Sequence, residues 1–301
     1  MKKISSILLL LLASLGISSC EDVIDLEVKE GVEQLVVDGW LTNLPEDQYI
    51  KLTLSQSYFD NSEPKPALNA TVTLADFLGN SITLEDSLGD GRYWLTHEQN
   101  FLTIGQDYTL TIVYGGQTYK SVSAMNRVPP IDSIIYEEFT QPFGADSIPK
   151  EGFLVQVYAK DFEGEGDSYW VRYYRNGILN NDPTLLTATY DAGFSAGSKT
   201  DGLVFIQPIR QSVNDFSKGP YQDGDRLKVQ IWSTGLDGFF FLNQVASESG
   251  NGGIFATPSA NIITNVANVN PDGLQPVGFF GISAVSEMEI VIDKNKALPP
   301  S

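Results

Sequence analysis

Leu35-Val-Val-Asp-Gly-Trp-Leu-Thr42 contains the β-branched and aromatic residues typical of a strand, and a turn residue, Asn43, follows it. Short runs of the same kind recur through the first half of the chain, at 49–54, 70–75, 81–84, 92–96, 107–113 and 117–123. Two glycines, Gly115 and Gly116, join the last two runs as a hairpin connection. Strands at this spacing predict a small β-sandwich, which we place at residues 32–128.

Alternating runs continue through the second half, at 133–139, 153–159, 169–174, 203–209, 226–232, 277–285 and 287–292. The stretch 236–248 differs, because its apolar residues recur near helical spacing and Gly250 is placed to end a helix. Val128-Pro129-Pro130 separates the two halves. Because proline has no amide donor and stiffens the chain, this segment is predicted to be a linker.

The order of the first runs, from Pro66 through Gly105-Gln-Asp-Tyr-Thr-Leu110, resembles that of a prealbumin-like β-sandwich. The fold class that we expect is therefore mainly β. An N-terminal prealbumin-like or Ig-like β-sandwich at 32–128 is followed by a larger β domain at 131–301, which carries one α-helix near 236–248.

The composition is that of a folded protein, since 42% of the 301 residues are apolar and 11% are aromatic. The 19 Lys and Arg residues are outnumbered by 38 Asp and Glu residues, which gives a net charge of −19. We expect no nucleic-acid partner, because phosphate contacts need clustered basic residues. A single Cys excludes a disulfide framework and a Cys-based zinc site, and a single His excludes most multi-histidine chemistry.

The first 19 residues have the features of a secretion signal. Lys2 and Lys3 supply the positive charge, and the apolar run at 7–15 is too short to span a bilayer. The run ends in Ile17-Ser-Ser-Cys20, which resembles a bacterial lipobox, with the only Cys of the chain at the lipid-accepting position. We predict that Cys20 is lipidated and holds the protein on a membrane. The alternative is an ordinary signal peptide with an incidental Cys.

A tether is expected at residues 20–31. Glu21 and Asp22 follow the cysteine directly and resemble the acidic export signal of Bacteroidota surface lipoproteins. They favour an outer-membrane protein exposed at the cell surface. The alternative is that two acids in an acidic chain carry no such signal.

Several segments of the chain resemble one family. They include the acidic hairpin and aromatic strand at 161–172, the Asp-Gly-Asp turn at 221–229, the stretches 253–262 and 278–284, and the opening strand at 35–43. Together with the lipobox, these segments resemble the family called domain of unknown function 4249. The resemblance implies a Bacteroidota outer-membrane lipoprotein, commonly encoded beside a TonB-dependent receptor. It carries no established reaction, so no catalytic residue is transferred to this chain.

An acidic run invites a calcium interpretation. Asp161, Glu163, Glu165 and Asp167 occupy alternate positions, with Gly166 sixth, as in part of an EF-hand loop. The twelfth position, however, is Arg172, where such a loop has a bidentate Glu. A solvated hairpin tip is the favoured interpretation and a calcium site the alternative. No other cofactor is expected.

Catalytic motifs are scarce. His97 lies beside Glu98 between two strands, and no Gly-x-Ser-x-Gly elbow accompanies it, so a surface histidine is favoured over a triad. A carboxylate pair for glycoside hydrolysis has no recognisable motif here, although any two of the acids could meet in a cleft.

Aromatic residues are the best candidates for a surface that binds a ligand or a partner. Trp170, Tyr173 and Tyr174 share one predicted strand, and alternation places Tyr173 on the face opposite to the other two. One of these faces is expected to be core, so only a subset can contact a ligand or a partner.

The function we expect is a non-enzymatic surface lipoprotein that docks on a TonB-dependent outer-membrane receptor and assists nutrient uptake. The alternative is a structural accessory in outer-membrane protein assembly or adhesion. A hydrolase that acts on surface polymers is disfavoured by the missing motifs.

Overall fold

The computed structural model describes residues 31–57, 60–252 and 260–300. The chain divides into a main unit, Glu33–Gln56 with Ser62–Ser301, and a second unit, Met1–Val32 with Ser57–Asn61. The elements of the main unit are mostly strands, together with one 14-residue helix, α3 (Leu236–Ser249), which confirms the mainly β expectation and the helix predicted at 236–248.

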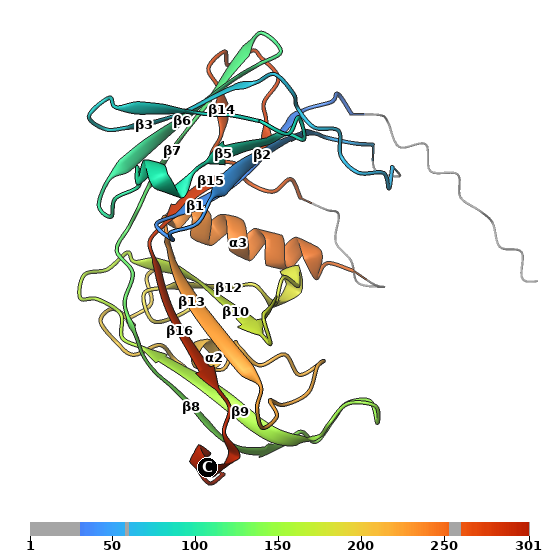
Figure 1. Ribbon diagram of the computed structural model, residues 1–301, viewed down its shortest axis with the longest axis vertical. Coiled ribbons are helices and arrows are strands. Elements are labelled where there is room, and N and C mark those ends of the chain that lie inside the picture. Colours follow the sequence, from blue (N-terminus) through green and yellow to red (C-terminus); the bar gives the residue numbers. More distant parts are fainter. Residues whose placement is uncertain (1–30, 58–59, 253–259, 301) are drawn as a thin grey trace, which may run out of the picture. The chain divides into compact units, whose positions relative to one another are not determined.

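Two sheets form the first sandwich (Figure 1). One has the order β15-β1-β2-β5, and its strands are β1 (Leu35–Thr42), β2 (Gln48–Leu54), β5 (Arg92–Leu95) and β15 (Val277–Ser283). The other has the order β14-β7-β6-β3-β4, and its strands are β3 (Thr71–Asp76), β4 (Ser81–Leu84), β6 (Asp107–Tyr114), β7 (Gln117–Ala124) and β14 (Ala267–Asn268). Inward-facing residues of both sheets form one core, which includes Leu35, Val37, Leu41, Leu52, Leu74, Leu110 and Ile112. Alternating burial along each strand produces this core, as the sequence pattern predicted.

Two strands of this first sandwich come from the far end of the chain. β15 pairs in parallel with β1, from Val36↔Val277 to Thr42↔Ser283, and β14 pairs with β7. The sequence analysis placed both segments in the domain at 131–301, because periodicity locates a strand but not its partner. Gly278 allows the close approach, since its φ is +96° and a Cβ there would collide with the carbonyl of Val37.

The second sandwich covers the rest of the main unit. Its larger sheet has the order β11-β10-β13-β16, with β12 also paired to β10, and its strands are β10 (Ser168–Arg175), β11 (Ile178–Leu179), β12 (Thr187–Tyr190), β13 (Arg226–Thr234) and β16 (Val285–Val291). A two-stranded sheet, β8 (Ile131–Thr140) with β9 (Glu151–Ala159), packs against it over a second core. That core includes Val155, Val157, Tyr169, Phe205, Val229 and Ile231.

One strand prediction was wrong. The stretch 203–209 forms an isolated bridge at Val204 and then the short helix α2 (Gln207–Arg210). Pro208 lies in the first turn of α2, where its missing amide hydrogen is tolerated, whereas a strand ladder would need that donor. Three short 3-10 helices complete the described elements: η1 (His97–Gln99), η2 (Pro183–Leu185) and η3 (Lys294–Lys296).

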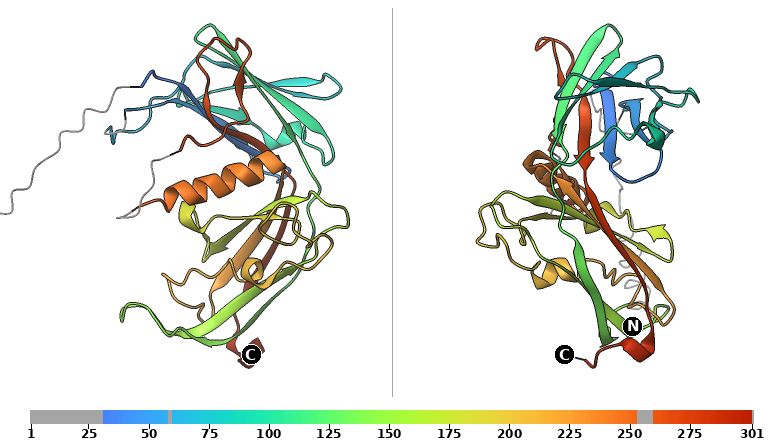
Figure 2. Two further views of the ribbon diagram at one scale, coloured as in Figure 1. Left: turned by 180° about the vertical axis from the view of Figure 1, so that it is seen from behind. Right: turned by 60° about the vertical axis from the view of Figure 1, so that its left-hand side comes forward.

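A single residue, Ala284, separates β15 from β16, so the chain passes from one sandwich to the other almost without a break (Figure 2). Ser233 on β13 holds this joint, because its amide donates to the Ala284 carbonyl and its Oγ accepts from the Ala284 amide, both at 2.9 Å. Helix α3 packs nearby through Phe239 and Leu242. None of the helices in the described part of the chain has the length and apolarity needed to cross a membrane.

Candidate functional site

The acidic run lies between β9 and β10, and its members have different surroundings. Asp161 is 3% exposed, although the sequence favoured a solvated tip. Its Oδ1 accepts a hydrogen bond from the Tyr169 hydroxyl at 2.6 Å, and its Oδ2 accepts one from the Gly202 amide at 3.1 Å. Glu163 and Glu165 are exposed, as expected of a hairpin tip.

Asp167 is bound by an arginine. Arg127, in the segment between β7 and β8, donates to both of its carboxylate oxygens, with the shortest contact at 2.6 Å. The same guanidinium donates to the Glu163 carbonyl and lies 4.6 Å from the centre of the Phe162 ring. The hydrogen bonds to Asp167 raise the pKa of Arg127. This ion pair therefore fixes the linker against the acidic hairpin.

Asp161 is instead grouped with two acids that the sequence analysis did not single out. One carboxylate oxygen each from Asp161, Asp191 and Asp201 lies within 4.8 Å of the other two. Burial raises the pKa of Asp161, and the nearby charges of Asp167 and Asp191 add to this effect. Sequence spacing gave no signal for this group, because Asp161 lies in the loop between β9 and β10, whereas Asp191 and Asp201 lie ten residues apart in the loop between β12 and α2.

The four acids that the sequence analysis gave as an alternative calcium site are therefore divided in the structure. Asp161 lies in the three-carboxylate group, and Asp167 is paired with Arg127. Glu163 and Glu165 belong to no converging acidic group among the described residues. Three other predicted residues, Cys20, Glu21 and Asp22, lie outside the residues that the structure describes.

His97 is exposed on η1. Its backbone amide and its Nδ1 both contact Oδ1 of Asp47 at 2.9 Å, and these contacts lower the pKa of Asp47. The histidine lines a small pocket of about 150 Å³, whose described lining contains no Ser or Cys. The geometry is that of a capped turn in which His97 contacts Asp47.

The aromatic strand β10 has two different faces, as alternation predicted. Tyr173 is buried in the second core, whereas Trp170, Arg172 and Tyr174 lie on the opposite face. The Arg172 guanidinium lies 4.6 Å from the centre of the Trp170 ring and 4.2 Å from that of Trp232, on β13. Among the described residues Arg172 has no ion-pair partner, and burial lowers its pKa.

A pocket of about 450 Å³ opens beside these residues. It is lined by Glu46, Tyr174, Asn176, Gly177, Arg226, Lys228, Gln230 and Glu289. We call the side chains of Trp170, Arg172, Tyr174, Lys228, Gln230 and Trp232 the Arg172 face, because strand register places all six on one side of the sheet. Lys228 pairs with Glu287 at 2.8 Å and Arg226 with Glu289 at 2.7 Å. The face therefore combines indole rings, a phenol and cations.

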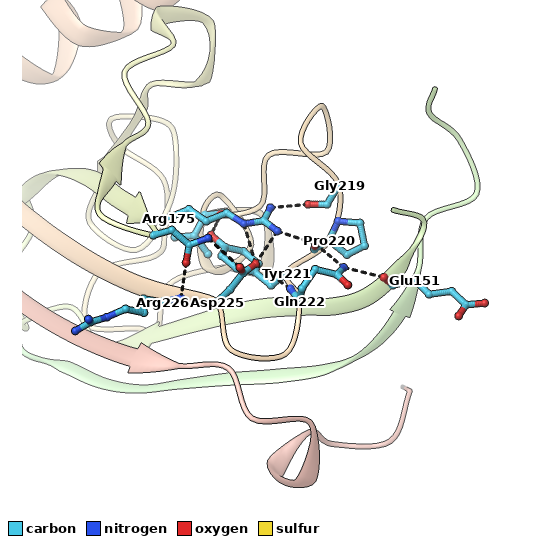
Figure 3. Close-up of polar contacts among 10 residues, drawn as sticks. Glu151, Arg175, Gly219, Pro220, Tyr221, Gln222, Asp225 and Arg226 are labelled. Atoms are coloured by element: carbon cyan, nitrogen blue, oxygen red, sulfur yellow. Dashed lines mark hydrogen bonds and ion pairs between the residues drawn. The ribbon is translucent and has the colours of Figure 1, made fainter. Parts of the chain in front are cut away.

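A further polar cluster surrounds Arg175, at the end of β10 (Figure 3). Its guanidinium donates to the carbonyls of Gly219 and Pro220 and to Oδ2 of Asp225, at 2.7–3.0 Å. It also lies 4.5 Å from the centre of the Tyr221 ring. Each guanidinium nitrogen donates a hydrogen bond within the protein. We therefore interpret this cluster as one that stabilises the turn before β13 and not as a binding site.

Comparisons with known proteins give one clear match. Residues 21–289 match the family model for "Domain of unknown function (DUF4249)". No curated protein matches the chain. Among solved structures, a two-domain fibronectin type-III segment from chicken tenascin matches with 13% identity, covering 67% of this chain and 89% of that one, at a TM-score of 0.20. A TM-score of 0.20 is too low for this similarity to support a conclusion about fold or function.

Proposed function

The chain belongs to the DUF4249 family, and on that premise we propose that it is a lipid-anchored outer-membrane protein that contacts a TonB-dependent receptor during nutrient uptake. In this proposal it provides a surface that binds the receptor, and it does not catalyse a reaction. The proposal has two parts, an anchor and a contact surface, which have separate support.

The anchor is supported by the N-terminal sequence. The only Cys of the chain, Cys20, ends a lipobox-like stretch, and Glu21 and Asp22 follow it. Each methylene of an acyl chain contributes roughly 0.8 kcal/mol of membrane binding, so a multiply acylated Cys20 is a stable anchor. The acidic pair directs the protein to the outer face of the cell.

A single observation supports the contact surface. Arg172 lies between Trp170 and Trp232, and it has no ion-pair partner among the described residues. Trp, Tyr and Arg are the residue types enriched among those that dominate binding energy in protein interfaces. Because the two rings hold the guanidinium in place, little side-chain entropy is lost when a partner carboxylate binds it.

The two sandwiches are connected to each other, and this connection favours binding of a partner at the Arg172 face. The joint at Ala284 and the contacts of the Trp40 ring with the rings of Trp170 and Phe279 connect the two sandwiches. A rigid surface loses little conformational freedom on binding, so more of the contact energy appears as affinity.

The test is a detergent pull-down of the tagged, full-length protein from native outer membranes, followed by mass spectrometry. Stoichiometric recovery of one TonB-dependent receptor supports the proposal. Recovery of outer-membrane assembly factors instead overturns it in favour of the structural accessory role. Recovery of nothing beyond a Cys20→Ala sample overturns the partnership.

A matched pair of variants locates the contact. Tyr174→Ala removes a ring at the open edge of the Arg172 face, and Phe143→Ala removes a ring that is 81% exposed in the loop between β8 and β9. The expected result is that only Tyr174→Ala reduces recovery of the receptor. Equal recovery with both variants contradicts the assignment of this face.

A further inference from the structure

Two loops of the second sandwich, the one between β9 and β10 and the one between β12 and α2, meet at one point. Asp161 follows β9, Asp191 follows β12, and Asp201 lies ten residues further on, in the loop that leads to Val204. Backbone hydrogen bonds hold these loops together, because the Asp161 amide donates to the Leu203 carbonyl at 2.9 Å and the Asp191 amide to the Asp167 carbonyl at 2.7 Å. The main chain therefore brings the three carboxylates to within 4.8 Å of one another.

The charges at this point are not balanced. None of the three aspartates forms an ion pair among the described residues, and the nearby guanidinium of Arg127 is committed to Asp167. Two buried carboxylates that share a site already disfavour each other's ionisation, and a third adds to the cost.

Two oxygens in the group also lack hydrogen bonds. Asp191 is 0% exposed, and its Oδ1 accepts from the Gly166 amide at 2.9 Å. Its Oδ2 is buried without a hydrogen-bond partner in the described structure, and so is Oδ1 of Asp201. A buried carboxylate oxygen left without a partner is destabilising, so its presence in a folded protein calls for a ligand.

We propose that Asp161, Asp191 and Asp201 bind a calcium ion. The donor set is made only of carboxylate oxygens, which hard cations prefer, and no described His or Cys belongs to it. Ca²⁺ accepts irregular arrangements of oxygen ligands, such as those that two loops provide, whereas Mg²⁺ demands near-ideal octahedral geometry.

The ion has a structural consequence. It connects the hairpin at 161–167 with both ends of the stretch 191–203 in the loop between β12 and α2, and it neutralises the repulsion that the three carboxylates otherwise impose. This site is independent of the receptor proposal, since it lies on different residues and needs no partner protein.

The test uses the full-length protein in detergent, stripped of metal with EGTA and then titrated with CaCl₂ in a calorimeter. We expect one Ca²⁺ per chain, with a dissociation constant in the range of about 10⁻⁴–10⁻³ M that is typical of extracellular modules. We also expect the melting temperature to rise with Ca²⁺ concentration, because a ligand that binds only the folded state stabilises it by mass action. Mg²⁺ at the same concentrations is expected to give a smaller shift.

Two variants and a matched control assign the site. Asp191→Asn and Asp201→Asn are expected to weaken Ca²⁺ binding by more than about tenfold, whereas Glu165→Gln, which changes an exposed acid of the same hairpin, is expected to leave it unchanged. If Asp191→Asn fails to fold, Asp201→Asn, which lies in a half-buried position, still decides the question. In EGTA Asp201→Asn is expected to melt at or above the wild-type temperature, and in Ca²⁺ below it.

Three outcomes overturn the proposal. The first is a wild-type protein with neither a binding signal nor a melting shift in Ca²⁺. The second is a response to Ca²⁺ that is equal in Asp201→Asn, Glu165→Gln and the wild type. The third is an Asp201→Asn variant that is more stable than the wild type in both EGTA and Ca²⁺, which would mean that the carboxylates only repel one another.

Discussion

Trp40 donates a hydrogen bond of 2.6 Å from its indole Nε1 to Oγ of Ser283, a residue 243 positions later in the chain. Ser283 in turn donates to the carbonyl of Ser233, on β13 of the second sandwich. The indole also lies 5.1 Å from the Trp170 ring and 5.4 Å from the Phe279 ring, measured between ring centres. One side chain of the first strand thus helps to join the two sandwiches.

Ser283→Ala is expected to destabilise the protein by about 1–3 kcal/mol, because it leaves the Trp40 indole and the Ser233 carbonyl without this partner in a buried place. Urea unfolding measures the loss. Ser81→Ala, at an exposed serine on β4, is the control and is expected to change stability by less than about 0.5 kcal/mol. Equal stability of the two variants would show that the joint does not depend on this hydrogen bond.

Gly278→Ala tests the parallel pairing of β15 with β1. Gly278 has a φ of +96°, and a Cβ there would collide with the Val37 carbonyl. Gly79, in the turn between β3 and β4, has a φ of +89° and no atom within 4 Å of an added Cβ. Both alanine variants incur the left-handed backbone cost of roughly 1–2 kcal/mol, but only Gly278→Ala adds a steric cost of about 1–3 kcal/mol.

Denaturant unfolding of the two glycine variants gives the comparison directly. A larger loss for Gly278→Ala supports the contact between the backbones of β15 and β1. If Gly79→Ala is destabilised as much, the close approach of these two strands is not what requires glycine at position 278.

The stability that Asp225 contributes is expected to disappear in acid. Burial opposes its ionisation, but hydrogen bonds from Asn176, the Gln222 amide and Arg175 outweigh burial and lower its pKa. The contribution is therefore complete above the unfolded-state pKa of about 3.9 and is lost as the pH falls through the lower pKa of the folded state.

Asp225→Asn is accordingly expected to cost roughly 1.5–3 kcal/mol at pH 7, the range for hydrogen bonds to a charged group, and progressively less below about pH 4. Urea unfolding from pH 3 to pH 7 measures the difference from wild type. Asp272→Asn, at an exposed acid, is the control and is expected to stay near the wild type throughout. A cost for Asp225→Asn that does not change with pH would contradict the role of its charge.

The anchor and the export signal can be separated by two substitutions. Cys20→Ala is expected to move the protein from the membrane fraction to the soluble fraction and to remove the acyl mass from its N-terminus. The double variant Glu21→Ala with Asp22→Ala is expected to stay membrane-bound but to become protected from protease added to intact cells. Continued digestion of the double variant would show that these acids are not the signal for surface exposure.

Much of the second sandwich could be anticipated from residue pattern. The helix at Leu236–Ser249 and the opposite faces of Trp170 and Tyr173 follow from periodicities of 3.6 and 2, which are local properties. The stretch 203–209 was wrongly predicted as a strand, because apolar residues alone do not distinguish a strand from a loop that buries single side chains and ends in a short helix.

The candidate metal site could be predicted from local sequence pattern even less than the strands could. The acidic run drew attention to Asp161, but its partners Asp191 and Asp201 have no motif around them. They meet Asp161 only because strand pairing places the end of β12 beside the start of β10, where Ser168 pairs with Tyr190. Contacts between residues so far apart in the chain depend on the whole fold and not on spacing.

By itself, the sequence determined most of the long strands, where the long helix lies and which N-terminal residues resemble a lipidation signal. These are properties of short stretches, since side-chain alternation, turn residues and recognition motifs are all local. Only the tertiary structure decided that β15 completes the first sandwich while β16, one residue later, belongs to the second. The physical reason is that a strand edge pairs with whatever complementary backbone and apolar face the folded chain brings to it, and many segments of this chain have the same alternating pattern.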